Sequence, residues 1–291
     1  MPVVVVTDSS SRLPASLADR YGIRQVPLHL TMDGNDYLEG VDDIPADIIS
    51  TPGVTTSGAN PHEMTVAFEE AIAASDGAGV VGVFMSRRLS GTWGAARLAA
   101  EKFPGLVRIV DSRSVGLAVG FTAIGAAQAA SDGADRDRVY ESAIRQAATV
   151  DSLICVHQLD NLRQSGRISA ASKMLGSALA IKPILHMVDG VLSLRERHRT
   201  FSKALSKMAD AAVESADDRP VTLGIQHSQS PELAREFAEQ LRGRLRAVTS
   251  ELVVDLGPVL GCHVGPGAIG LALATHLEPV DGTADADPGA H

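Results

Sequence analysis

The chain has 291 residues, 45% of them hydrophobic, with 26 Lys and Arg against 35 Asp and Glu and a net charge of −9. This length exceeds what one hydrophobic core usually organises, so we expect two domains. The negative charge argues against a general nucleic-acid-binding or anionic-membrane-binding surface. A signal-peptide pattern and a run of about 18 strongly apolar residues are both missing, which predicts a cytoplasmic protein without stable membrane insertion.

The first half of the chain alternates apolar runs with helical patterns, as is typical of α/β domains. Asn60-Pro61 is a typical start of a helix. The alternation predicts a parallel-sheet domain over residues 1–150. In chain order we expect a strand over residues 3–6, helices over 13–20 and 61–74, a strand over 80–84, a helix over 92–102, a strand over 107–110, and helices over 115–130 and 139–149.

The second half has a different pattern, which predicts a mixed α+β domain over residues 151–280. Residues 281–291 are polar, rich in Asp, Gly and Ala and without period, so we expect a disordered tail. In chain order we expect a strand from 153–156, a helix over 174–179, a hairpin of 181–187 and 191–195 around Asp189-Gly190, helices over 202–216 and 231–242, and strands over 221–226 and 247–254.

Hydroxyl side chains follow four strand-like runs of the first half. They lie in residues 7–11, 55–57, 86–92 and 111–112. Ligands of an open parallel sheet bind beyond the carboxyl ends of its strands, where helix N-termini offer free N–H groups. We therefore expect these segments to gather in one crevice that binds an oxyanion.

The sequence predicts neither a metal ion nor a nucleotide cofactor. Cys155 and Cys262 lie far apart without the spacing of a metal site, so we expect reduced, structural thiols. The pattern Gly265-x-Gly267-x-x-Gly270 matches the dinucleotide fingerprint by spacing. It lacks the βαβ context and the later acidic residue, because only about 20 residues of expected helix and polar tail follow it.

A hydrolase is the alternative from a different class of function. Ser90, His263 and Asp8 are residue types that could act as nucleophile, base and orienting acid. No Gly-x-Ser-x-Gly elbow surrounds Ser90. We keep an α/β hydrolase, or a phosphoester-processing enzyme with His263 as base, as the alternative.

Eight short motifs follow one another between residues 3 and 277. In this order and spacing they closely resemble the DegV family of bacterial fatty-acid-binding proteins. The motifs are Thr7-Asp8-Ser9-Ser10, Thr56-Ser57, Leu89-Ser90-Gly91-Thr92-Trp93, Asp111-Ser112, Leu162-Arg163-Gln164-Ser165-Gly166-Arg167-Ile168, Ile181-Lys182-Pro183-Ile184-Leu185, Arg199-Thr200, and Gly257-Pro258-Val259 with His263 and Gly265-Pro266-Gly267-Ala268.

The resemblance implies a two-domain fold that holds a long-chain fatty acid, such as palmitate, between the domains. In family members that work with a fatty acid kinase, the bound acid is presented for phosphorylation to acyl phosphate, which feeds phospholipid synthesis. The resemblance therefore implies a non-catalytic carrier subunit without a cofactor, whose partner is a fatty acid kinase.

The resemblance also assigns the residues of the ligand site. It places the carboxylate-binding threonine at Thr56, the binding serine at Ser90 and the ligand-side histidine at His263. Hydroxyls and backbone N–H groups in these loops can hold a carboxylate without neutralisation by a cation. The full set that we expect at the carboxylate is Thr56, Ser57, Ser90, Gly91, Thr92 and His263.

Two arginines, Arg167 and Arg199, match arginines that face the kinase in the family. The family's Lys-Gly before the first of them is Gln164-Ser165 here, so one basic residue is missing from the expected partner surface. Aliphatic residues of the second half are expected to line the acyl channel. They are Met174, Leu175, Leu179, Ile181, Ile184 and Leu185.

Overall fold

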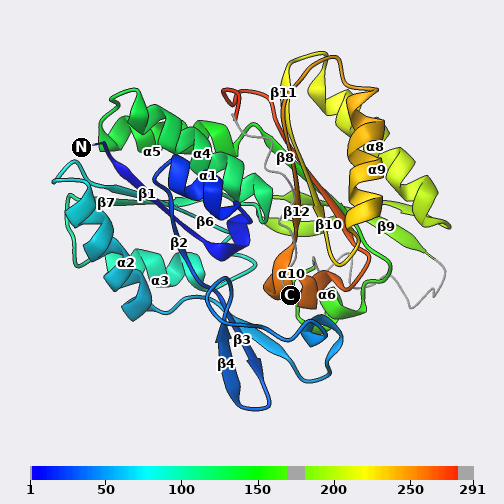
Figure 1. Ribbon diagram of the computed structural model, residues 1–291, viewed down its shortest axis with the longest axis horizontal. Coiled ribbons are helices and arrows are strands. Elements are labelled where there is room, and N and C mark those ends of the chain that lie inside the picture. Colours follow the sequence, from blue (N-terminus) through cyan, green and yellow to red (C-terminus); the bar gives the residue numbers. More distant parts are fainter. Residues whose placement is uncertain (1, 169–180, 281–291) are drawn as a thin grey trace.

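The computed structural model describes residues 2–168 and 181–280. Its first sheet has four parallel strands, in the order Arg24–Val26 (β2), Val4–Asp8 (β1), Val80–Phe84 (β6) and Val107–Asp111 (β7). The central strands β1 and β6 are mainly continuous apolar runs, and successive side chains of a strand point to opposite faces. Both faces of the sheet are therefore apolar, and each is covered by helices (Figure 1).

Helices lie on both sides of this sheet. Those on one face pack with Val5, and those on the other pack with Val4 and Val6. The first group is Ala15–Arg20 (α1), Leu117–Ser131 (α4) and Arg136–Ala147 (α5), and the second is Pro61–Ala74 (α2) and Thr92–Ala100 (α3). The predicted bounds of α2 are confirmed, and Asn60 caps this helix by accepting hydrogen bonds from the backbone of His62 and Glu63.

The second sheet has six strands in mixed directions. Only its last two neighbours, Val221–His227 (β11) and Val248–Asp255 (β12), are parallel. The other strands, in order from the opposite edge, are Val191–His198 (β10), Lys182–Val188 (β9), Val150–Cys155 (β8) and Ile269–Ala274 (β13). Helices Phe201–Ala216 (α8) and Pro231–Arg242 (α9) cover its outer face, and Asp160–Gln164 (α6) and Gly257–Val264 (α10) lie at one end (Figure 1).

Helix α4 lies between the two sheets and contacts strands of both. Its residues are mostly alanine, glycine and small apolar types, and nearly all are buried. A Cβ atom on Gly224 of β11 would meet Leu117 and Phe121 of α4, so glycine permits this close approach. One core cluster includes α4 together with residues of both sheets. The division near residue 150 and the domains 1–150 and 151–280 therefore stay a prediction.

Two sequence predictions need correction. Thr55–Ser57 (β5) does not end a strand of the parallel sheet but is the third strand of a small antiparallel sheet with His29–Met32 (β3) and Asn35–Leu38 (β4). The helix expected after Gly270 is strand β13, because its apolar residues are fully buried between β8 and β11. The short turns Ser9–Ser11 (η1) and Ile48–Ser50 (η2) complete the described elements.

Three predictions lie outside the described residues: the helix over 174–179, the channel residues within it and the tail 281–291. Within the described part of the chain, no helix is both long and apolar enough to cross a membrane. The predicted fold class, a parallel-sheet part followed by a mixed α+β part, is confirmed.

Candidate functional site

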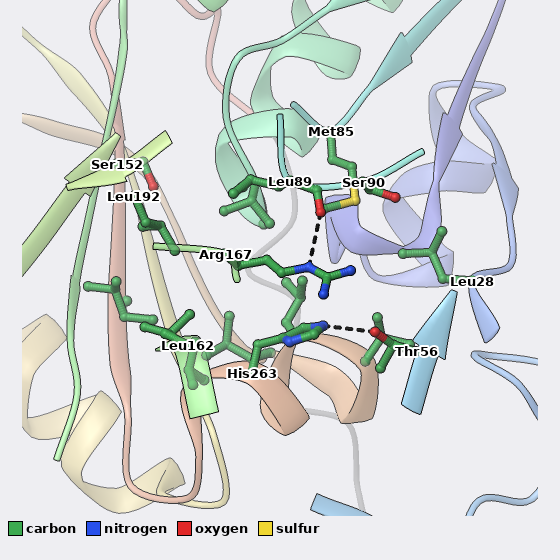
Figure 2. Close-up of a pocket in the computed structure, with 18 of the residues that line it drawn as sticks. Leu28, Thr56, Met85, Leu89, Ser90, Ser152, Leu162, Arg167, Leu192 and His263 are labelled. Atoms are coloured by element: carbon green, nitrogen blue, oxygen red, sulfur yellow. Dashed lines mark hydrogen bonds between the residues drawn. The ribbon is translucent and has the colours of Figure 1, made fainter. Parts of the chain in front are cut away.

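A cavity lies where the small antiparallel sheet, the second sheet and α10 meet. It holds about 890 Å³ of empty space, part of it open to solvent. Polar side chains gather on one side, where Figure 2 shows Thr56, Ser90, Arg167 and His263. Most of the remaining lining is aliphatic and includes Leu28, Met85, Leu89, Leu162, Leu192 and Leu256.

Thr56 and His263 meet across the cavity from distant parts of the chain. Thr56 lies in β5 and His263 in the last turn of α10, and the Thr56 Oγ1 to His263 Nε2 distance is 2.8 Å. Burial, and then the positive charge of Arg167, lower the pKa of His263 to about 4. The imidazole is therefore neutral at pH 7. In its Nε2–H tautomer it donates to Thr56 and leaves the threonine O–H free to donate into the cavity.

Two carboxylates at its N-terminus hold α10, and thus His263, in place. The buried Glu39 accepts a hydrogen bond from the backbone N–H of Val259 at 3.1 Å. Asp255 accepts one from the backbone N–H of Gly257 at 2.6 Å. Acidic groups at a helix N-terminus satisfy free N–H donors and favour the helix dipole. Burial nevertheless raises the pKa of Glu39.

Ser90 lies in the loop that leads into α3. Its Oγ is 2.9 Å from Thr92 Oγ1 and accepts a hydrogen bond from Thr92 N at 3.2 Å. Gly91 is the N-cap of α3 and makes no side-chain cap hydrogen bond. The first N–H groups of a helix have no partner within it. Thr92 is fully buried and is not among the cavity-lining residues. Its contact with the cavity is through the hydrogen bonds to Ser90, whereas Ser57, Ser90 and Gly91 line the cavity. That any of these residues binds a carboxylate stays a prediction.

Gly58 lets the β5 loop approach the Ser90 loop. A Cβ atom at this position would overlap Thr92 Oγ1 and lie 3.0 Å from Ser90 Oγ. We expect Gly58→Ala to displace one of the two loops and to lower the free energy of unfolding by roughly 1–2 kcal/mol. Urea unfolding measures this loss. The matched control is Gly94→Ala in α3, where a Cβ atom meets nothing within 4 Å. An equal, small effect of both changes would contradict the packing argument.

The structure treats the two predicted partner-facing arginines differently. Arg167 points into the cavity, where its Nε donates to the carbonyl of Leu89 at 3.3 Å and its Nη1 to that of Ser165 (Figure 2). Arg199 is exposed between β10 and α8 and is not a cavity residue. Arg167 is therefore a candidate ligand-binding residue, a role that its sequence motif did not predict.

The residues of the hydrolase alternative do not form a triad. Ser90 bonds to Thr92, and His263 bonds to Thr56. Asp8 accepts hydrogen bonds from the backbone N–H groups of Ser10 and Met85, each at 3.0 Å, and burial raises its pKa to about 6. Among the described residues, no hydrogen bond joins Ser90 to His263 or His263 to Asp8. The arrangement thus favours binding over nucleophilic catalysis.

Of the predicted aliphatic lining, only Ile181, Ile184 and Leu185 are among the described residues. None of these three lines the cavity, and the last two are fully buried in the core. The lining comes instead from α6, α10, strands of the second sheet and the loops of the first sheet. Gly265 and Gly267 form the turn from α10 to β13 with positive φ angles of 76° and 78°. This turn is therefore not the first strand-to-helix loop of a dinucleotide fold.

Comparison with known proteins establishes the family. A family model described as "Uncharacterised protein, DegV family" matches residues 2–276. The chain belongs to the DegV family. A DegV domain-containing protein of Mycobacterium tuberculosis is 45% identical over 279 residues, which cover 96% of this chain and 99% of the relative. The predicted family resemblance is thus confirmed.

Two solved structures of DegV family proteins share the fold. One is from Thermus thermophilus and is described as fatty acid binding, with a TM-score of 0.88, 29% identity, and coverage of 94% of this chain and 100% of that chain. The other is DegV of Bacillus subtilis, described as a fatty acid binding protein, with a TM-score of 0.85, 27% identity, and coverage of 94% and 99%.

Proposed function

We propose that this DegV family protein is a non-catalytic carrier that binds a long-chain fatty acid, such as palmitate, in the cavity. The observation that carries the proposal is the division of one cavity into a polar side and a mainly aliphatic remainder. The similarity to fatty-acid-binding DegV structures supports the same ligand class. The carboxylate belongs at Thr56, Ser90 and Arg167, and the acyl chain lies among the aliphatic side chains.

The polar side suits an ionised carboxylate. Thr56 and Ser90 offer hydroxyl donors, and the N-terminus of α3 begins beside Ser90. A carboxylate moved from water onto neutral donors gains little, because each hydrogen bond replaces one to water. The guanidinium of Arg167 adds a charge-assisted donor inside the cavity, which strengthens the interaction. His263 acts through Thr56 by orienting its hydroxyl.

The acyl chain supplies most of the binding free energy. Burial of a sixteen-carbon chain contributes about 0.8 kcal/mol per methylene, on the order of 12 kcal/mol in total before the costs of ordering and association. The aliphatic lining accounts for this part of the ligand. A ligand held this tightly remains bound during purification.

Mass spectrometry of a solvent extract tests the binding function. We expect the purified protein to release a stoichiometric amount of a long-chain fatty acid. The enzyme alternative predicts an empty protein that turns over ester or phosphoester substrates. An extract without fatty acid, together with no detectable binding of added palmitate, would overturn the proposal.

We further propose that the bound carboxylate is presented to a fatty acid kinase, for acyl phosphate formation that feeds phospholipid synthesis. Thr56, Arg167 and His263 also line a second hollow, whose roughly 1320 Å³ of empty space includes open solvent. A partner could reach the carboxylate from this side. Incubation of the loaded protein with a bacterial fatty acid kinase and ATP should yield acyl phosphate, and its absence with every kinase tested would contradict presentation.

A further inference from the structure

A glutamine lies in the predominantly aliphatic cavity. Gln226 is in β11, is only 3% exposed and lines the cavity. Its neighbours across the sheet are Gly270 of β13 and, beyond it, Ile154 of β8, and both also line the cavity. Directly paired residues share one face of a sheet. This face is therefore the floor of the acyl-binding region, and the amide lies on it.

The orientation of the Gln226 amide follows from its one hydrogen bond. The backbone N–H of Leu117, the first residue of α4, donates to Gln226 Oε1 at 2.8 Å. The partner of an N–H group must be the amide oxygen, so Nε2 is on the opposite side of the group. Glycine makes room for this arrangement, because a Cβ atom on Gly116 would overlap Oε1 and one on Gly270 would lie 3.4 Å from Nε2.

The amide nitrogen of Gln226 has no hydrogen-bond partner among the described residues. Nε2 is not among the fully buried side-chain atoms that lack a partner, so water in the ligand-free cavity can reach it. A donor that a ligand buries without a partner is unfavourable. A saturated acyl chain packed against Nε2 excludes this water and imposes that cost. A chain that carries an oxygen atom at the same depth removes the cost, because its lone pairs accept the hydrogen bond.

A second polar group lies farther along the same sheet face. Ser152 of β8 lines the cavity, and Figure 2 shows it on the side away from Thr56. It also borders a separate polar hollow, where the pairing of β8 with β9 stops at Leu153 and His186. The end of the cavity that is remote from the carboxylate site is therefore partly polar.

We propose that the cavity selects fatty acids whose chain carries an oxygen acceptor, a keto or hydroxyl group, which Gln226 Nε2 recognises. This inference rests on the fatty-acid function proposed above and specifies the ligand class. Gln226 sets the specificity of the chain, whereas Thr56, Ser90 and Arg167 bind the carboxylate common to all fatty acids.

Competition binding with a fluorescent fatty acid tests the inference. The probes are stearic acid and a set of oxostearic acids that differ in the position of the keto group, because a keto oxygen accepts but does not donate. We expect at least one oxostearic acid to bind the wild-type protein about tenfold more tightly than stearic acid. In Gln226→Met, which keeps the length of the side chain but not the donor, this ratio should fall to about one.

The matched control is Gln146→Met, a change of a buried glutamine in α5 that does not line the cavity. It should keep the wild-type ratio. If Gln226→Met does not fold, the ratio of the two affinities in the wild-type protein still tests the inference. The inference would be overturned if the wild type bound every oxostearic acid no more tightly than stearic acid. It would also be overturned if a folded Gln226→Met kept the wild-type ratio of the two affinities. Neither result would contradict fatty acid binding itself. Failure to bind any of these acids would overturn the proposed function as well.

Discussion

Replacement of Arg167 by methionine is expected to weaken fatty acid binding about 10- to 100-fold, because a charge-assisted hydrogen bond contributes about 1.5–3 kcal/mol. The guanidinium lies in the cavity between Leu89 and His263 (Figure 2). Two of its N–H groups bond to backbone carbonyls, and the others can reach a carboxylate. Methionine keeps an apolar stem of similar length, so the loss of affinity measures the contribution of the charged guanidinium group. Titration of the delipidated protein with a fluorescent fatty acid gives the Kd.

Arg199→Met is the matched control for this prediction. The family resemblance assigned both arginines to the partner-facing surface. Arg199 is exposed and does not line the cavity. We expect Arg199→Met to bind fatty acid like the wild type. If Arg199 faces a kinase, acyl phosphate formation falls in this variant while its lipid content stays unchanged. If a folded Arg167→Met variant bound fatty acid with wild-type affinity, Arg167 would not be a carboxylate-binding residue. Its predicted role on the partner-facing surface would then be favoured.

Three of the four parallel strands, β1, β6 and β7, were predictable because their signal is local, whereas Arg24–Val26 (β2) was not predicted. Val80–Phe84 is a short apolar run with turn-forming residues on both sides. The helix after Asn60 was predictable for the same reason, because its capping pattern needs no distant partner. The order of motifs then identified the family, and the family supplied Thr56, Ser90 and His263. The structure brings these residues to one cavity, although Thr56 and His263 are 207 positions apart.

The missed features depend on contacts between distant segments. Thr55–Ser57 has only three residues and no apolar period, and it becomes a strand by pairing with His29–Thr31. Arg167 points inward because the carbonyl of Leu89, 78 positions earlier, accepts its Nε–H. Gln226 is the last residue but one of β11 and gives no sequence signal of the cavity that it lines. Side-chain direction and cavity lining follow from packing, which periodicity does not encode.

His263 should make the ligand-free protein sensitive to acid. Burial and the nearby Arg167 lower its pKa from 6.5 to about 4 in the folded state. As the pH falls below 6.5, the unfolded chain takes up this proton before the folded protein does, so the free energy of unfolding decreases. The decrease ends near pH 4, where the folded protein is protonated as well. A pKa difference of this size corresponds to about 3 kcal/mol.

His263→Gln tests this prediction because glutamine keeps a hydrogen-bond donor for Thr56 but does not titrate. Urea unfolding of the delipidated proteins at pH 7 and at pH 4 gives the acid-induced loss of stability for each. Carboxyl groups contribute to that loss in both proteins, so the difference between the two isolates the histidine. We expect the wild type to lose about 3 kcal/mol more than His263→Gln. The control His62→Gln, at an exposed position of α2, should lose as much stability as the wild type.

Equal losses of stability in the wild type and in His263→Gln would show that the imidazole is protonated in the folded protein near neutral pH. In that case His263, like Arg167, would hold the carboxylate by its charge and not through the hydroxyl of Thr56.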